Sequence, residues 1–581
     1  MIVRHRALAV VACAIAAIVV TGCSRKTETP PAAASTVAAE MAADTIYAGG
    51  DVVTVSDAQP TAEAVAVKGG KILAVGARTD VEGAHKGAAT KVVDLAGRTL
   101  VPGFFDAHAH VLGFGAQAVG ANLLASPDGT ANTIDDLVAA LQEFAKGPDV
   151  ARTGWIFGMG YDDALLGRHP TRDDLDKVSK DVPVIAVHIS GHFSVLNSAG
   201  LAKVGYTAAT PDPEGGVIRR REGSREPNGV LEELASFPVM IAAISPPTPE
   251  ANDYFTRKGL ELAKRYGYTT VIEGRAFAAQ HAAMLDAAKR GLFDIDVISY
   301  IDYMDRKVIP TPVASNYENR YRIGGLKITL DGSPQGRTAW RTIPYLIPPD
   351  GQKAGYKGYP AIPDTKVVEA LFDEAYQKGW PVQVHANGDA AIDQVIAAMK
   401  PVHAKYGPGD RRHALIHGQF VRRGDQLDAL KELQVIASLF PMHTFYWGDW
   451  YDQIIGPELA QQISPIKTAL NKGLVVTSHT DAPVALPNLM QVMWATVNRT
   501  SRSGKVMGPD ERLTPLEALK SFTLWGAYQH FEDKTKGSIE PGKLADFVIL
   551  DKNPLTVDPT TINQIRVLET IKEGQTVYVA Q

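Results

Sequence analysis

The chain has 581 residues, of which 45% are hydrophobic and 21% are charged, so it is long enough to bury a large core. Its formal net charge of −5 at pH 7 excludes a strongly basic nucleic-acid-binding protein, and we predict no nucleic-acid partner. Only two cysteines occur, Cys13 and Cys23, so the chain beyond them has neither disulfides nor thiolate ligands. Any metal site must therefore use His, Asp, Glu or Lys side chains.

The first 23 residues have the pattern of a bacterial lipoprotein signal peptide. Arg4 and Arg6 form a basic start, residues 7–20 are apolar, and a run of small residues ends at Cys23. A transmembrane anchor is the alternative interpretation, but the apolar run is shorter than the roughly 20 residues that span a bilayer. We predict lipid on Cys23 and membrane attachment only through that lipid. Ser24 favours a periplasm-facing place in the outer membrane of the bacterial cell envelope.

Both ends of the remaining chain are rich in short β-type runs. Residues 24–43, rich in Pro, Ala, Thr and Ser, predict a flexible tether. Runs of β type, broken by glycine, fill residues 44–100, and a second set fills residues 537–581. We expect the two sets to join in one β-sandwich that flanks the middle of the chain.

Residues 101–536 alternate short apolar strands with amphipathic helical stretches, which is typical of parallel βα units in an α/β fold. Several of these strands end in polar residues, and the strand at residues 99–101 leads to His108. In a (β/α)8 TIM barrel such strand ends meet on one face. A bare barrel takes about 250 residues, so we expect an inserted segment at about residues 115–249.

The first candidate site lies in His108-Ala109-His110, which follows an apolar strand. Side chains alternate along an extended chain, so the two imidazoles lie on the same side and can hold one metal ion. Taken alone this pattern is weak, because a His-x-His pair is often a surface or core pair. The longer string from Gly97 to His110 resembles the opening strand of the amidohydrolase superfamily.

Four further strings resemble one branch of it, the amidohydrolase-3 (YtcJ-like) family, which includes deformylases of N-substituted formamides. They occupy residues 191–198, 326–333, 385–391 and 480–484. The resemblance runs from about residue 44 to the C-terminus. It implies an enzyme that hydrolyses a non-peptide, amide-type C–N bond of a small molecule, using metal-activated hydroxide as the nucleophile.

The resemblance also implies a metal-ligand set. His108 and His110 would hold the more buried ion, and His385 and His417, at the ends of the fifth and sixth barrel strands, would hold a second. Neutral imidazoles and carboxylates suit zinc and related divalent ions, so we expect one or two ions, with zinc favoured.

Lys327 and Asp481 complete this set. The resemblance implies that Lys327 bridges both ions as a carboxylated lysine, and that Asp481, on the eighth strand, is the last ligand and the catalytic proton shuttle. Alternatively, an unmodified Lys327 pairs with Asp331, and the site may then hold a single ion. Glu273, which ends the third predicted strand, is an alternative ligand.

Further polar and aromatic residues near strand ends and loops are candidates for substrate contact. They are His192, His443, Asp162, Arg337 and Trp447. Their alternative interpretations are a hydrogen-bonded core histidine, a helix-capping aspartate, a surface salt bridge and a packed aromatic. His479 is left unassigned. We take the remaining histidines considered as incidental: His5, His85, His169, His281, His403 and His530.

Two other functions stay open at this point. Activated water also cleaves lactones and phosphate esters, so a lactone or ester hydrolase is the first alternative. A lipoprotein that binds a small ligand without turnover is the second, although every expected metal position is filled. No Gly-x-Ser-x-Gly elbow or P-loop occurs in the sequence. The partner is a small-molecule substrate, and the sequence leaves a homodimer open.

Overall fold

The computed structural model describes residues 41–581, apart from residues 245–247, 314 and 350. The predicted signal peptide with Cys23, and the tether up to residue 40, lie outside the described residues. No helix within the described ranges has both the length and the apolar character needed to cross a membrane.

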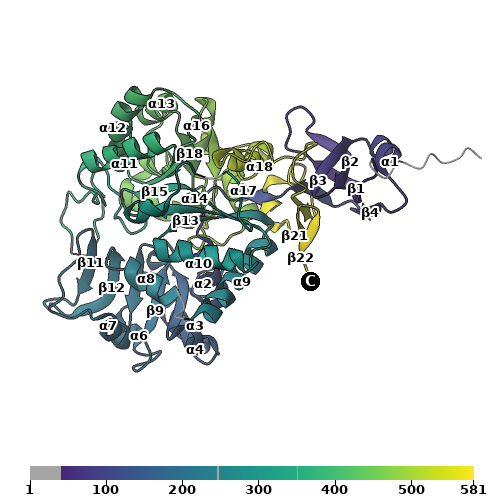
Figure 1. Cartoon of the computed structure of the whole chain (residues 1–581). Helices are drawn as coiled ribbons and strands as arrows, with labels where there is room; N and C mark the ends of the chain where they lie inside the picture. Colours follow the sequence, from purple (N-terminus) through teal and green to yellow (C-terminus); the bar gives the residue numbers. More distant parts are fainter. Residues whose placement is uncertain (1–40, 245–247, 314, 350) are drawn as a thin grey trace, which may run out of the picture.

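An eight-stranded parallel sheet forms the centre of the molecule (Figure 1). Its strands, in sheet order, are β6 (Phe104–Phe105), β13 (Tyr268–Ala276), β14 (Asp296–Asp302), β15 (Tyr321–Thr329), β16 (Val382–Ala386), β17 (Ala414–His417), β18 (Ile436–Leu439) and β19 (Val476–Ser478). The segments that follow β6 and β19 exchange backbone hydrogen bonds, from Asp481 N to His108 O at 3.1 Å and from His110 N to Ala482 O at 2.8 Å. The fold is therefore TIM-barrel-like, as predicted.

Helices connect the barrel strands and pack against them. They include α10 (Ala278–Lys289), α11 (Thr365–Lys378), α12 (Asp389–Tyr406), α13 (Asp425–Glu432), α14 (Met442–Ile455) and α17 (Leu489–Asn498). In α11 the Asp364 side chain caps the first turn, and Gly379 ends the helix in a left-handed conformation. Its buried residues Val368, Leu371, Phe372 and Ala375 recur at helical spacing, so one apolar face covers the sheet.

The two chain ends share a second sheet, in the order β22-β21-β20-β5-β1-β2-β3 with β4 beside β1. Its strands are β1 (Thr45–Val53), β2 (Thr61–Lys68), β3 (Lys71–Gly76), β4 (Lys91–Asp94), β5 (Thr99–Pro102), β20 (Phe547–Leu550), β21 (Val567–Lys572) and β22 (Gln575–Val579). The pairing describes one connected sheet, which we call the terminal sheet. A two-layered sandwich is not confirmed.

One expectation about the barrel was wrong. The strand at residues 99–101 belongs to the terminal sheet as β5, which pairs antiparallel with β20, and the first barrel strand is β6. Gly103 separates the two strands where the chain passes very close to β13. A Cβ atom on Gly103 would lie 2.3 Å from Thr269 Oγ1, so only glycine fits this crossing.

The chain segment between barrel strands β6 and β13 forms a third sheet. Its strand order is β11-β12-β10-β9-β8-β7. Its strands are β7 (Ala121–Asn122), β8 (Ile156–Tyr161), β9 (Val184–His188), β10 (Phe193–Leu196), β11 (Gly216–Arg220) and β12 (Pro227–Glu233). These strands fall within residues 115–249, where the sequence suggested an insertion. Helices α2 (Val111–Val119) and α9 (Pro249–Arg265), which contact each other, join this inserted sheet to the barrel.

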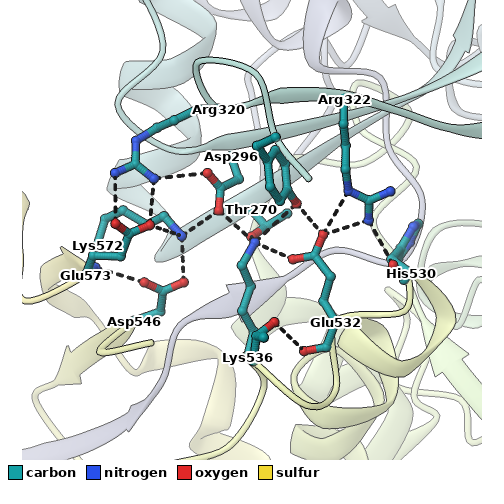
Figure 2. A network of polar contacts seen from close by, with 12 residues as sticks. Thr270, Asp296, Arg320, Arg322, His530, Glu532, Lys536, Asp546, Lys572 and Glu573 are labelled. Carbon is teal, nitrogen blue, oxygen red and sulfur yellow. Dashed lines mark hydrogen bonds and ion pairs between the residues drawn. The ribbon is translucent and has the colours of Figure 1, made fainter. Parts of the chain in front are cut away.

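Buried ion pairs hold the barrel to the terminal sheet (Figure 2). Asp296, the first residue of β14, accepts hydrogen bonds from Lys536 Nζ at 2.7 Å and Lys572 Nζ at 2.6 Å. Lys572 also pairs with Asp546 at 2.7 Å, and Lys536 pairs with Glu532. All five side chains are buried, so each charge depends on its partners. We call these residues the Asp296 network.

Candidate metal centre

The barrel strands bring all six predicted metal ligands to one pocket at their carboxyl ends. His108 and His110 follow β6, and Asp481 follows β19. The other three lie on neighbouring strands β15, β16 and β17: Lys327, His385 and His417. All six line the same cavity of about 180 Å³. Residues separated by more than 370 positions thus meet in the way the strand-end pattern predicts.

The tightest group of donor atoms surrounds Asp481. His108 Nε2 and His110 Nε2 each lie 3.5 Å from Asp481 Oδ1, and His417 Nδ1 lies 3.8 Å from Oδ2. One donor atom from each of His108, His417 and Asp481 lies within 4.8 Å of the others. Asp481 Oδ1 is buried and has no hydrogen-bond partner in the described structure. This donor set therefore fits a divalent cation.

Neighbouring side chains fix the orientation of the first two imidazoles. His108 Nδ1 lies 2.7 Å from Gln383 Oε1, and His110 Nδ1 lies 3.2 Å from Glu273 Oε1. Both rings therefore direct Nε2 toward Asp481, as the ligands of a metal site require. Glu273 thus orients a ligand. It lies on the second barrel strand, β13, and not on the third as predicted.

Neighbouring charges favour a protonated His110 and a deprotonated Asp481 in the metal-free protein. Burial alone lowers the pKa of His110, but its contacts with Asp481 and Glu273 outweigh burial and raise that pKa to about 9. Burial raises the pKa of Asp481, but His110 and the cations nearby outweigh it and lower that pKa below its ordinary value. Asp481 is therefore a carboxylate at neutral pH.

Lys327 is buried in the floor of the pocket, and its Nζ lies 3.3 Å from His108 Nε2. Burial lowers its pKa to about 7, so much of the amine is uncharged near neutral pH. The alternative pairing of Lys327 with Asp331 is wrong. The Asp331 carboxylate instead accepts hydrogen bonds from backbone N–H groups of Asn387, Gly388 and Trp340, at 2.7 to 3.0 Å.

His385 and His417 stand next to this group. Their ring centroids are 4.6 Å apart, and the His417 ring is 5.4 Å from that of His108. Burial lowers the pKa of both well below the ordinary value, so the imidazoles are neutral and can act as ligands. His479, left unassigned above, lies 3.1 Å from His417 and 3.1 Å from Ser438 Oγ. It contacts His417 from outside the pocket lining.

Among the five predicted substrate contacts, the structure places only His192 in this pocket. Its Nδ1 lies 2.7 Å from Glu233 Oε2, a residue of the inserted sheet that the sequence analysis missed. Glu233 Oε1 in turn accepts a hydrogen bond from Thr338 Oγ1 at 2.7 Å. The insertion therefore supplies a fixed histidine to a site built mainly by the barrel.

The other four predicted contacts lie outside the pocket lining, and each has a structural partner instead. Asp162 caps α5 (Asp163–Leu166), and His443 lies 3.3 Å from Ser464 Oγ. Trp447 packs in the core beside His443, with ring centroids 6.0 Å apart. Arg337 donates to a backbone carbonyl in the loop after β15, that of Pro348 at 3.3 Å. These four side chains do not line this pocket, because local hydrogen bonding and packing hold them elsewhere, and their contact with a substrate stays a prediction.

Asp106 is a second residue that the sequence analysis missed. Its buried carboxylate accepts hydrogen bonds from His108 N at 3.3 Å, Thr480 N at 3.2 Å and Tyr268 Oη at 2.9 Å. Burial raises its pKa to about 7. Asp106 thereby ties the segment that carries His108 to the segment that carries Asp481. Its position two residues before His108 was the available indication.

Gly274 leaves the space that His108 occupies. A Cβ atom there would lie 2.2 Å from His108 Cε1, and the Gln383 contact prevents the ring from moving away freely. We expect Gly274→Ala to weaken zinc binding about 10- to 100-fold, as loss of an orienting contact does. Zinc titration of the variant measures this change. Gly83→Ala, in α1 (Arg78–His85) with open space around the new Cβ, is the matched control. Equal zinc affinity in both variants would contradict the proposed steric role.

A parallel barrel with histidine and carboxylate donors at its strand ends defines a class of hydrolases. Comparison with known families identifies the branch. A sequence model of the amidohydrolase family matches residues 91–578. The chain belongs to this family, which confirms the prediction of a hydrolase that acts on carbon–nitrogen bonds other than peptide bonds.

Individual relatives match nearly the whole chain. The protein YtcJ of Bacillus subtilis (strain 168) is 26% identical over 92% of this chain and 99% of its own length. An N-substituted formamide deformylase of Arthrobacter pascens is 28% identical over 91% of this chain and 97% of its own length. A solved structure of an uncharacterized metal-dependent hydrolase from Pyrococcus horikoshii matches with a TM-score of 0.69 at 24% identity, covering 92% of this chain and all of the other. This last match supports the fold.

Proposed function

We propose that this protein is a metal-dependent amidohydrolase that cleaves an amide-type C–N bond of a small molecule. The observation that carries the proposal is the cluster of His108, His110 and His417 around the Asp481 carboxylate, whose buried Oδ1 has no hydrogen-bond partner in the described structure. Oδ1 lies 3.5 Å from an imidazole nitrogen of both His108 and His110 but accepts no hydrogen bond, and a divalent cation would supply the missing partner. Zinc suits the imidazole and carboxylate donors best.

The residues divide between two adjoining positions in the proposed site. His108, His110 and Asp481 would hold one ion, and His385 and His417 a second. A bound ion of this kind acts as a Lewis acid and lowers the pKa of water from about 15.7 toward ~7.

Two side chains of the pocket supply the remaining chemistry. Asp481 accepts the proton of the attacking water at its carboxylate and returns it to the leaving nitrogen. His192, whose Nδ1 faces Glu233, presents Nε2 to the pocket, where it hydrogen-bonds the reacting group of the substrate. The apolar residues around them exclude water.

We further propose that Lys327 is carboxylated when the metal is bound. Its uncharged amine would add to carbon dioxide and release a proton to solvent, which would convert a poor ligand into an anionic oxygen ligand for a metal ion. Activity of the metal-free protein should then return faster with zinc plus bicarbonate than with zinc in carbon dioxide-free buffer. In Lys327→Ala, bicarbonate should have no effect and a short carboxylic acid should restore part of the activity. Equal recovery of the wild type in both buffers would contradict this role.

Metal removal tests the proposed function itself. Dialysis against a chelator should abolish hydrolysis of a panel of N-formyl and N-acetyl amines, and zinc should restore it. His108→Ala should keep the fold, measured by circular dichroism, but lose bound metal and activity together. His281→Ala is the matched control, because His281 contacts Tyr321 Oη away from the pocket. Full activity of the metal-free protein on these amides would refute the proposal.

Two further proposals rest on the sequence alone. We propose that the protein is attached to the bacterial cell envelope, on the periplasmic side of the outer membrane, by lipid on Cys23. Its partner there is a small-molecule substrate, with a homodimer as the proposed assembly.

A further inference from the structure

A second cavity adjoins the pocket that holds the metal donors. It measures about 550 Å³ and lies between α2, α8 (Phe237–Ile244), α9 and α10. Phe237, Ile241 and Phe277 line both cavities, so the two spaces adjoin each other. Apolar side chains form most of its wall. A space of this size and character is typical of a site for a small apolar group.

Arg275 stands where the two cavities meet, and it is the only charged residue among the described residues that line the larger one. It lies at the carboxyl end of β13, two residues after Glu273, the partner of His110. Its guanidinium carbon lies 5.0 Å from the ring centroid of Phe237 and 5.6 Å from that of Phe277. Two aromatic rings thus fix the plane of the cation.

Only one nitrogen of this guanidinium, Nε, donates a hydrogen bond within the described protein. Nε donates to Asp302 Oδ2 at 2.8 Å, and the two terminal nitrogens donate to no described residue. Glu273, two residues earlier, accepts from the backbone N–H groups of Leu112 and of Arg275 itself, and it lies against His110 Nδ1. Because Arg275 lines both cavities, we infer that its terminal nitrogens are available to a ligand there.

This arrangement selects among ligands by charge. A neutral apolar ligand would displace water from the terminal nitrogens and leave buried donors without acceptors, which is costly. A ligand carboxylate would accept from both nitrogens at once, and such bidentate pairs are strong. The large apolar cavity and the single fixed cation thus point to the same kind of molecule.

We propose that the substrate is an apolar amide with a carboxylate close to the scissile bond. Arg275 binds the carboxylate, the scissile bond lies among the metal donors, and the large apolar group fills the 550 Å³ cavity. An N-acylated apolar amino acid has this form. The assignment of the substrate class rests on the proposed amidohydrolase function, but the binding preference of Arg275 can be measured without turnover.

Binding of two uncleavable probes tests the role of Arg275. We expect the metal-loaded protein to bind 4-phenylbutyrate about 10- to 100-fold more tightly than 4-phenylbutan-1-ol in calorimetry. Arg275→Gln should remove this preference, and Arg275→Lys should keep part of it. Arg306→Gln is the matched control, because Arg306 pairs with Glu374 outside both cavities. An unchanged preference for the carboxylate in both Arg275 variants would overturn the proposal. Equal binding of the two probes by the wild type would also overturn it, and that measurement does not depend on the folding of a variant.

Turnover separates this inference from the proposed function. We expect kcat/KM for N-acetylphenylalanine to exceed that for N-acetylphenethylamine about 10- to 100-fold, with the difference lost in Arg275→Gln. Equal turnover of the two amides would overturn the carboxylate preference and leave the amidohydrolase function standing. Cleavage of neither, together with an Arg275-dependent preference for 4-phenylbutyrate, would instead count against the proposed hydrolysis of these amides and support the anion site.

Discussion

Asp481→Asn is expected to lower kcat by about 100- to 10,000-fold, because asparagine cannot take a proton from water or return it to the leaving nitrogen. The change should leave the backbone intact. Asp481 has a φ of +51°, a left-handed conformation that asparagine adopts more readily than most residues. Fold should therefore survive while catalysis fails. Steady-state kinetics on a cleaved amide, with metal content measured on the same preparation, gives both quantities.

The matched control is an Asp-to-Asn substitution outside the pocket. Asp286→Asn changes an exposed aspartate on α10 that pairs with Arg290, and its kcat should equal that of the wild type. If Asp481→Asn kept metal and more than a tenth of the wild-type kcat, Asp481 would not be the proton shuttle. If it lost the metal entirely, restoring zinc in excess should recover binding without recovering kcat.

Asp296→Asn is expected to lower the free energy of unfolding by about 3–5 kcal/mol, the usual cost of breaking a buried ion pair from one side. Lys536 and Lys572 both lose a carboxylate within 2.7 Å, and neither can reach water. Their attraction also holds the pKa of Asp296 well below its ordinary value in the folded protein, although burial alone would raise it. Urea unfolding followed by circular dichroism measures the loss.

Asp173→Asn provides the control for this change. Asp173 and Arg221 form an exposed pair at 2.7 Å, and pairs of this kind contribute less than about 1 kcal/mol. The two variants should therefore differ clearly in their urea midpoints. Equal midpoints would mean that Asp546 and Glu532 alone satisfy the two lysines.

The meeting of the candidate metal donors at one face could be predicted from the sequence because it depends on a local pattern, whereas their role as ligands was implied by the family resemblance. Each lies at or just after a short apolar strand, and parallel strands bring such ends together whatever lies between them. That rule placed His385 beside His417 and brought Asp481 to His108 without knowledge of the loops. The same local logic, with glycine and proline density, indicated the position of the insertion.

Contacts that depend on tertiary partners could not be predicted in this way. Asp331 was the alternative partner considered for Lys327, but it accepts hydrogen bonds from backbone N–H groups of the next strand end and of the loop after β15. Residues 99–101 have the composition of a barrel strand, yet they pair with β20 from the far end of the chain. Arg275 lies in no motif, and only the cavity reveals its exposed edge.

The place of β5 in the terminal sheet has a consequence for the order in which the chain is made. β5 lies between β1 and β20, so one of its edges is ready as soon as the N-terminal strands exist. The other edge finds its partner only when residues 547–550, near the end of the chain, have been synthesised. Throughout synthesis of the barrel, an apolar strand therefore presents unpaired backbone groups, which other chains can pair with. Premature termination before β20 would make that exposure permanent.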